Sequence, residues 1–250
     1  MTGLAVKRRA RRAFERQLDY QRRKAASIRG SEAEMIAGMA AHSAYVRDKL
    51  EAFGPLPSSV RALEVGSGAH GLIFFFEAAE RVGVDPLADH YRVLFPAWQG
   101  RARTIAAGGE QLPFGDSSFD VVLCDNVVDH AEDPRRIVAE MARVLRPGGL
   151  LYFTVNVHHR LYHLASLVHA SWRALGVPFE VTPFADHTVH LTLESARKLF
   201  AGLPLELIAE SDTVAETKRA GRHLAARHAG DQLKRLFFKN AQWEAIAVKV

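Results

Sequence analysis

The chain has 250 residues, of which 48% are hydrophobic and 24% are charged, a composition typical of a globular protein with a sizeable buried core. A single cysteine, Cys124, excludes an internal disulfide framework and a cysteine-rich zinc site and favours a reducing compartment. No stretch reaches the roughly 18 apolar residues of a membrane span, and no apolar segment of a secretory signal follows the basic N-terminus, so we expect a cytoplasmic protein.

The positive charge is concentrated at the N-terminus. The formal net charge is +5, and basic residues between Lys7 and Arg29 account for the excess. Such an arm suits nucleic acid, an anionic surface or an acidic partner, although charge runs are more often solvated helix faces. Ser31–Phe53 then carries apolar residues at helical spacing, and the breaker cluster Gly54–Ser59 separates it from the next segment. We therefore expect a basic helical leader over residues 1–57.

From residue 58 onward the chain alternates between strand and helix patterns. Seven short apolar runs are expected to be strands: Arg61–Val65, Val82–Asp85, Arg103–Ala106, Phe119–Cys124, Leu150–Val155, Leu205–Ala209 and Ala245–Val250. The helical patterns are Leu72–Ala79, Asp133–Leu145, Ser195–Ala201 and Ala215–Lys239, with Pro86–Gly100 helical or irregular. Such alternation predicts right-handed crossovers, and hence an α/β fold with a seven-stranded, mostly parallel sheet and helices on both faces.

The alternation is interrupted once. After the fifth expected strand, an aromatic and histidine-rich stretch with a helix over Leu161–Leu175 forms an insert at about residues 157–186. We therefore expect one domain over residues 58–250 that contains this insert.

The most informative stretch is the glycine-rich turn in Leu63–Gly71. Gly66, Gly68 and Gly71 end the first expected strand, and glycines there let the backbone approach a ligand closely because no Cβ intervenes. Asp85 ends the second expected strand, at the spacing where a carboxylate takes both hydroxyls of a ribose. The pattern predicts a nucleoside-binding turn.

Glu64, at the end of the first expected strand, indicates the charge of the ligand. A carboxylate there would repel the pyrophosphate of a dinucleotide. It suits a ligand with a positive charge and no phosphate. The residues therefore favour an adenosyl-sulfonium cofactor over a nicotinamide dinucleotide.

Four ordered stretches resemble class I S-adenosylmethionine-dependent methyltransferases, in particular the small-molecule subset known as type 11. They are Leu-Glu-Val-Gly-Ser-Gly at 63–68, Gly-Val-Asp at 83–85, Glu-Gln-Leu-Pro-Phe…Ser-Phe-Asp-Val-Val at 110–122 and Arg-Val-Leu-Arg-Pro-Gly-Gly-Leu-Leu at 143–151. The resemblance covers roughly residues 60–156 and implies a Rossmann-like fold with S-adenosylmethionine as cofactor and S-adenosylhomocysteine as product.

The resemblance also implies roles for individual residues. Glu64, Gly66, Ser67 and Gly68 would hold the methionine portion, and Asp85 would take the ribose hydroxyls. The backbone at Cys124 and Asp125 would meet the methionine amino group, and the loop at Gly109 and Glu110 would edge the adenine. The family commonly has an aspartate where this chain has Gly108, so either another residue contacts the adenine amino group or backbone and apolar walls hold the ring.

Methyl transfer is an in-line displacement, and a base is needed only where the acceptor loses a proton in that step. The candidate catalytic residues near strand ends are Asp129, His130 and His158. Any of these histidines can equally be a capping or packing residue. No short metal-ligand signature is present, so no metal site is expected.

These features predict methyl transfer to an O, N or C atom of a small organic or secondary metabolite. One alternative is an RNA methyltransferase that uses the basic arm for phosphate contacts. A second alternative is a catalytically silent module that keeps the fold for binding. The sequence leaves the acceptor and the oligomeric state open.

Overall fold

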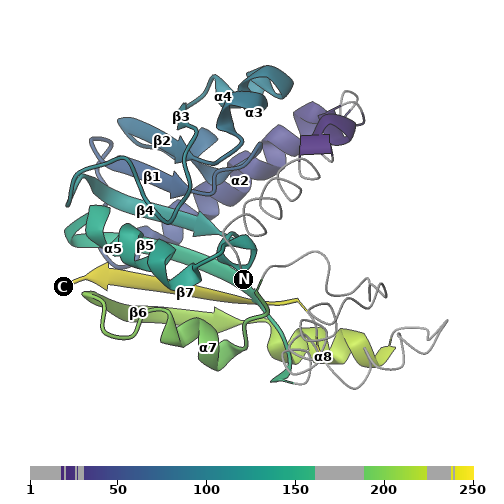
Figure 1. The fold of residues 1–250 in the computed structure, drawn as a ribbon, viewed down its shortest axis with the longest axis vertical. Coiled ribbons are helices and arrows are strands. Elements are labelled where there is room, and N and C mark those ends of the chain that lie inside the picture. The colour runs from purple at the N-terminus through teal and green to yellow at the C-terminus, as the bar shows by residue number, and fades with distance from the viewer. Residues whose placement is uncertain are drawn as a thin grey trace, which may run out of the picture.

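A seven-stranded sheet forms the centre of the molecule (Figure 1). The computed structural model describes residues 18–19, 21–25, 27, 31–160, 189–223, 238 and 240–250. The strands are β1 (Arg61–Val65), β2 (Glu80–Val84), β3 (Arg103–Ile105), β4 (Phe119–Asp125), β5 (Leu145–Val157), β6 (Leu205–Asp212) and β7 (Ala241–Lys249). Their order is β3-β2-β1-β4-β5-β7-β6, with β1 to β5 parallel and β7 antiparallel to both of its neighbours. The predicted mostly parallel α/β sheet is confirmed.

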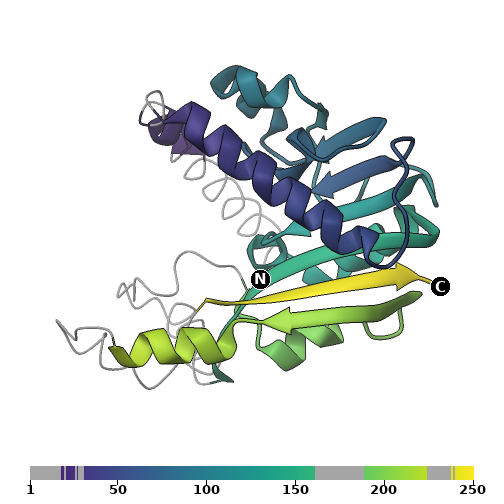
Figure 2. The same cartoon turned by 180° about the vertical axis from the view of Figure 1, so that it is seen from behind.

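Helices cover both faces of the sheet, as predicted (Figures 1 and 2). The front face in Figure 1 carries α5 (Pro134–Val144) and α7 (Leu193–Lys198). The opposite face packs against α2 (Glu32–Glu51), α3 (Ala88–Leu94) and α4 (Pro96–Gln99), and α8 (Val214–His223) follows β6. None of the helices in the described part of the chain has both the length and the apolar character needed to cross a bilayer.

Helix α2 covers one face of the sheet. Val46 and Leu50 are fully buried and share an apolar cluster with Val121 of β4 and Tyr152 of β5. The predicted helix over this part of the leader is therefore confirmed. The division of the chain at residue 57 stays a prediction, but α2 contributes to the same core as the strands that follow it.

The predicted α-helix over Leu72–Ala79 is wrong. The chain forms only a single 3-10 turn, Leu72–Phe74, and β2 already begins at Glu80. Phe74 and Phe76 are both fully buried in one apolar cluster, whereas an α-helix would point residues two apart in different directions. Burial of both rings therefore favours an irregular connection over a helix.

Other boundaries also differ from the prediction. β5 begins at Leu145, before the Pro-Gly-Gly stretch expected to precede it, and β7 begins at Ala241 rather than Ala245. β7 reaches back to Ala241 because it pairs continuously with β5 from Leu150 to Val157, and β5 begins at Leu145 because Leu145 pairs with Phe119 of β4. The predicted helix Leu161–Leu175 lies outside the described residues, as do residues 224–237 and 239 of the segment expected to be helical after β6.

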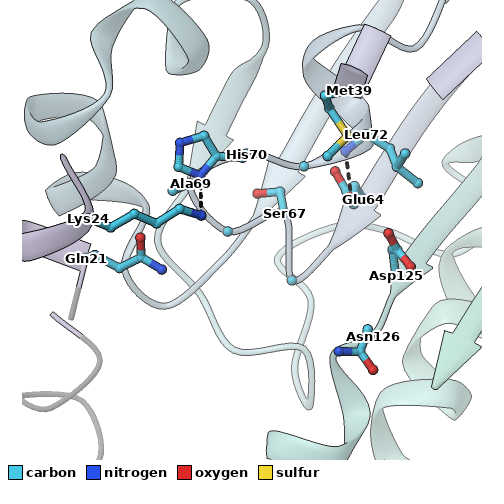
Figure 3. A pocket seen from close by; sticks show the side chains of 13 residues that line it. Gln21, Lys24, Met39, Glu64, Ser67, Ala69, His70, Leu72, Asp125 and Asn126 are labelled. Atoms are coloured by element: carbon cyan, nitrogen blue, oxygen red, sulfur yellow. Dashed lines mark hydrogen bonds between the residues drawn. The ribbon is translucent and has the colours of Figure 1, made fainter. Parts of the chain in front are cut away.

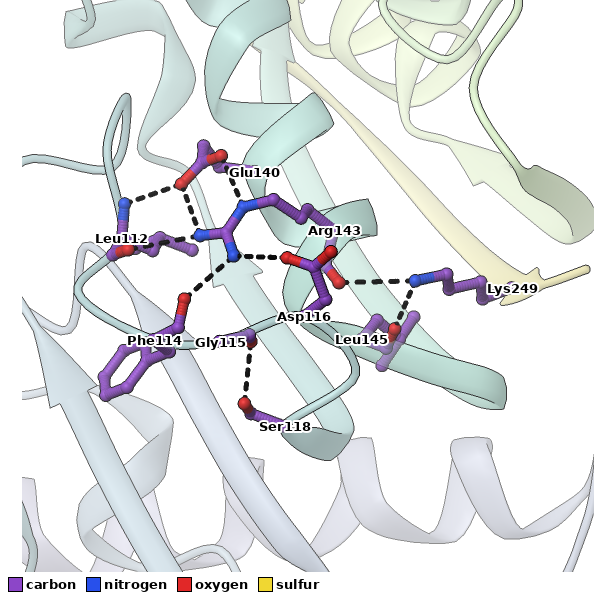
Figure 4. Close-up of polar contacts among 9 residues, drawn as sticks. All are labelled: Leu112, Phe114, Gly115, Asp116, Ser118, Glu140, Arg143, Leu145 and Lys249. Atoms are coloured by element: carbon purple, nitrogen blue, oxygen red, sulfur yellow. Dashed lines mark hydrogen bonds and ion pairs between the residues drawn. The ribbon is translucent and has the colours of Figure 1, made fainter.

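Arg143 of α5 fixes the loop between β3 and β4 (Figure 4). Its guanidinium donates to both carboxylate oxygens of Glu140 at 2.8 Å and to Asp116 Oδ1 at 2.9 Å. It also donates to the carbonyl oxygens of Leu112 and Phe114, at 3.2 and 2.8 Å. Because these acceptors span the loop, α5 holds its backbone against the sheet.

We predict that Leu50→Ala destabilises the protein by about 2–5 kcal/mol, because it leaves a cavity between α2 and the sheet. Chemical denaturation of the full chain measures the change. Asp48→Ala, at an exposed position of the same helix, is the control and should change the free energy of unfolding by less than about 0.5 kcal/mol. Equal effects of the two substitutions would show that α2 does not contribute to the folded core.

Candidate functional site

A cavity of about 380 Å³ lies beside the turn that follows β1 and reaches the end of β4 (Figure 3). Its wall includes five of the residues predicted to bind a cofactor: Glu64, Gly66, Ser67, Gly68 and Asp125. The carboxyl ends of parallel strands are where ligands bind in open α/β sheets. The position of the cavity agrees with that rule.

The turn after β1 is shaped by two glycines. Gly66 and Gly68 have positive φ angles of 74° and 54°, a region that residues with a side chain rarely adopt. The N–H groups of Gly66 and Ser67 both donate to the Val84 carbonyl of β2, at 2.7 and 3.1 Å. A Cβ on Gly66 would overlap with the γ-methyl groups of Val127. The turn is therefore held between β2 and the segment that follows β4.

The side chain of Glu64 binds the backbone at the far end of the turn. Its carboxylate oxygens accept from the N–H groups of Leu72 and Ile73, at 3.2 and 2.9 Å. Burial raises the pKa of Glu64 to about 8, although the hydrogen bonds from the two N–H groups lower it. The negative charges of Asp125 and Asp85 raise it further. The side chain thus caps the 3-10 turn and places an acid at the cavity wall.

Asp85 lies directly beyond β2 and touches the same turn. Its Oδ2 accepts from the Gly68 N–H at 3.1 Å, and its Oδ1 accepts from the Leu87 N–H at 2.8 Å. Burial raises the pKa of this carboxyl, while the two N–H groups lower it. The hydrogen bond from Gly68 places Asp85, the residue predicted to bind the ribose, at the edge of the turn predicted to bind the methionine portion.

The end of β4 forms the other wall. Asp125 Oδ1 accepts from the Thr154 hydroxyl at 2.5 Å, and its Oδ2 lies 3.8 Å from Nε2 of His42 on α2. Asn126 has a φ of 56°, and its side-chain oxygen accepts from the backbone and side-chain nitrogens of Asn156 at 3.2 and 2.6 Å. These contacts to β5 fix the direction in which the chain leaves the sheet.

Comparison with known proteins agrees with this geometry. Residues 63–153 match a family model described as a methyltransferase domain. A relative from Mycobacterium sp. (strain JLS), described as an uncharacterized methyltransferase, is 41% identical over 107 residues, which cover 40% of this chain and 40% of the relative. The chain thus spans about two fifths of the length of that relative.

Solved structures share the fold at low sequence identity. Geranyl diphosphate C-methyltransferase from Streptomyces coelicolor A3(2), determined with Mg²⁺, geranyl diphosphate and S-adenosyl-L-homocysteine, has a TM-score of 0.58 at 15% identity, covering 84% of this chain and 77% of that one. The [4+2]-cyclase SpnF has a TM-score of 0.54 at 18% identity, covering 82% and 80%. Because SpnF is described as a cyclase, the shared fold does not by itself define the chemistry.

Four of the residues predicted to bind the cofactor lie outside the described cavity wall: Asp85, Gly109, Glu110 and Cys124. Gly109 packs closely on Val65, because a Cβ there would come within 2.9 Å of its Cγ1. Glu110 faces the start of α5, where its Oε1 accepts from the Glu132 N–H at 3.3 Å. Cys124 is fully buried, and burial raises the pKa of its thiol well above the usual range. Their roles in binding stay predictions.

The three predicted catalytic residues fall into two groups. Asp129 is fully buried in the 3-10 turn Val128–His130 after β4, and its Oδ1 lies 3.8 Å from Nε2 of the half-exposed His130. His158 is buried beyond β5, and its Nδ1 accepts from the Asn240 N–H at 3.2 Å. His130 is thus exposed to solvent, whereas the His158 ring is enclosed, and none of the three residues belongs to the described cavity wall. In the described ranges, no group of three or more His, Cys, Asp or Glu side chains has the arrangement of a metal site.

Sequence reasoning missed several residues of the cavity wall. Gln21, Lys24, Met39 and His70 line it, and His42 approaches Asp125 from α2. His70 stands inside the glycine motif, so its position was a usable signal. The others come from the leader, and no local pattern in the sequence indicates which leader residues reach a strand end far away in the chain.

We predict that Gly66→Ala destabilises the domain by about 1–3 kcal/mol more than Gly148→Ala, because overpacking adds to the strain of a positive φ. Gly148 is the matched control, since its φ is also 74° but a Cβ there meets nothing within 4 Å. Chemical denaturation measures both values. Val127→Ala removes the overlapping methyl groups and should recover much of the excess in a double-mutant cycle. Equal losses for the two glycines would contradict the close packing of this turn.

We also predict a pH dependence that comes from Glu64. Its pKa is about 8 in the folded protein against an ordinary value of 4.5, so between these values the folded state keeps a proton that the unfolded chain releases. The free energy of unfolding of the wild type therefore falls relative to that of Glu64→Gln as the pH rises through this interval, by up to about 1.4 kcal/mol per unit. Denaturation of both proteins between about pH 5 and pH 8 measures the difference. A difference that rises with pH would mean that the N–H donors outweigh burial.

Proposed function

We propose that the protein transfers a methyl group from S-adenosylmethionine to an O, N or C atom of a small organic molecule. The observation that carries the proposal is the acidic cavity beside a glycine turn at the carboxyl ends of β1 and β4, in a domain of the methyltransferase family. Glu64 and Asp125 in its wall attract a cation. The sulfonium and the amino group of this cofactor are both positively charged.

The geometry of the turn argues against a dinucleotide. A pyrophosphate binds to free N–H groups at the N-terminus of a helix that follows the turn. Here the turn leads into a single 3-10 turn, and the Glu64 carboxylate already occupies the N–H groups of Leu72 and Ile73. A phosphate would meet a buried acid instead of free donors. The residues present therefore fit an adenosyl ligand without phosphate.

Within this proposal, different residues bind the methionine, ribose and adenine parts of the cofactor. Gly66, Ser67 and Gly68 contact the methionine portion, and the backbone at Asp125 meets its amino group. Asp85 takes the ribose hydroxyls, because its oxygens keep lone pairs beyond the two N–H bonds they accept. The adenine lies at the loop around Gly109, where Arg136 Nε donates to the Glu110 carbonyl at 2.8 Å and so fixes the backbone that replaces the missing aspartate.

The bound cofactor supplies the electrophilic methyl group, and the protein supplies position. Where the acceptor must lose a proton, His130 is the candidate base, because its side chain is 54% exposed and Asp129 lies beside it. Asp129 holds the ring by its charge and stabilises the imidazolium that forms. His158 is buried against Asn240 and orients the end of β5.

A small-molecule acceptor is favoured over RNA. Solved neighbours of the fold include a methyltransferase determined with geranyl diphosphate. The basic residues that motivate the RNA alternative lie between Lys7 and Arg29, and of these only Arg22, Arg23 and Lys24 belong to the described residues. That alternative therefore rests on charge alone.

The proposal predicts that the purified protein binds S-adenosylmethionine and S-adenosylhomocysteine, and that Asp85→Ala weakens both. Leaving the ribose hydroxyls without their acceptor should lower the affinity by about 1–3 kcal/mol, or roughly 10- to 100-fold. Calorimetric titration measures the affinities. Asp89→Ala, which removes an exposed acid four residues away, is the control and should leave both affinities unchanged.

Two results would contradict the proposal. One is a wild-type protein, folded by circular dichroism, that binds neither ligand. The other is binding of a nicotinamide dinucleotide in preference to both adenosyl ligands. Either result would make a binding module with another ligand the leading interpretation of the fold.

A further inference from the structure

Lys24 is a half-buried cation at the wall of the cavity. It belongs to the described segment 21–25 of the leader, far in sequence from the methyltransferase domain, and its ammonium Nζ lies 3.5 Å from Nδ1 of His70 in the glycine motif (Figure 3). Burial lowers the pKa of Lys24. Among the described residues, no carboxylate lies within ion-pair distance of its ammonium group. A cation removed from water without a counter-ion is costly, so an anion in the cavity would stabilise it.

His70 positions the Lys24 ammonium group but does not neutralise its charge. Burial, together with the nearby Lys24, lowers the pKa of His70 to about 4, so the ring is neutral near pH 7. Phe95 and Trp98 hold the ring edge-on, with centroids 4.6 and 4.5 Å away. A neutral imidazole in a fixed position can accept one hydrogen bond from Lys24. The ammonium group keeps two further donors for a ligand.

The two ends of the cavity carry opposite charges. Lys24 lies at one end, and Glu64 and Asp125 lie on the other side of Ser67 (Figure 3). The Ser67 hydroxyl and Gln21 Oε1 are buried without a hydrogen-bond partner among the described residues. Ser67 is 2% and Gln21 is 7% exposed. Buried polar atoms are normally satisfied, so these groups, Gln21 beside Lys24 and Ser67 in the middle of the cavity, indicate a polar ligand, and the opposite charges at the two ends favour one that carries both signs.

We propose that Lys24 binds the α-carboxylate of the amino acid end of the cofactor, with the Ser67 hydroxyl as a second donor. This assignment rests on the proposed function and makes the N-terminal leader part of the cofactor site. The carboxylate of a methionine group cannot lie against Glu64 and Asp125 without repulsion. At the Lys24 end it forms charge-assisted hydrogen bonds, while the ammonium group of the same ligand faces the two acids.

The test compares two ligands that differ only in the carboxylate. Decarboxylated S-adenosylmethionine keeps the sulfonium and the amine. Calorimetric titration of the full chain should show that the wild type binds S-adenosylmethionine about 10- to 100-fold more tightly than the decarboxylated ligand. In Lys24→Met this preference should collapse to within about threefold, through loss of affinity for S-adenosylmethionine alone, and Lys24→Arg should keep most of it.

Arg23→Met is the matched control, because it removes one positive charge from an exposed position of the same segment and should leave the preference unchanged. A Lys24→Met protein that is folded and retains the wild-type preference would overturn the assignment of Lys24. So would an equal loss of preference in Arg23→Met, which would indicate long-range attraction. Failure of the wild type to bind either ligand would overturn the proposed function as well, so the two failures are distinguishable.

Discussion

The site depends on one buried contact, that between the Glu64 carboxylate and the N–H groups of Leu72 and Ile73. A helix in this place would satisfy its own backbone and leave its first N–H groups free for an anion. Because a side chain from β1 binds these groups instead, the connection to β2 contains one 3-10 turn, and Phe74 and Phe76 enter the core. The same contact brings negative charge to the place where a dinucleotide fold offers positive charge.

The buried acid also sets the electrostatics around it. Burial raises the pKa of Glu64, and the nearby Asp125 and Asp85 raise it further, because neighbouring negative charges disfavour another carboxylate in a desolvated site. Protonation of Glu64, whose pKa lies near 8, relieves this repulsion, and a cationic ligand would relieve it by compensating the charge. Binding and proton release are therefore coupled in the proposed function, because the ligand and the proton serve the same carboxyl group.

Sequence reasoning predicted the parts of the fold that depend on residues close together in the sequence. β1 and β4 are buried, short and followed by turn residues, so their positions were correct within one residue. Glu64, Gly66, Gly68 and Asp125 lie together as expected, since they follow adjacent parallel strands. The helix after β1 was wrong because its apolar run has no strict period, and only the tertiary contact of Glu64 decides its form. Strand ends such as Ala241 of β7 depend on the pairing partner, which a single strand does not specify.

The leader shows what local patterns cannot supply. The spacing of apolar residues predicted its helix α2. The contacts that α2 makes with the sheet depend on packing between residues far apart in the sequence. Leu50 against β4 and β5 and His42 beside Asp125 are examples. The family match begins at residue 63, so the acidic end of the cavity lies inside the matched domain and the cationic end, at Lys24, lies outside it. The charged side chains that the matched residues contribute to the described cavity wall are acids, which attract a sulfonium and an amine, whereas the lysine of that wall, Lys24, belongs to the leader. Under the proposed assignment of Lys24, recognition of the complete zwitterion therefore requires the leader as well as the matched residues.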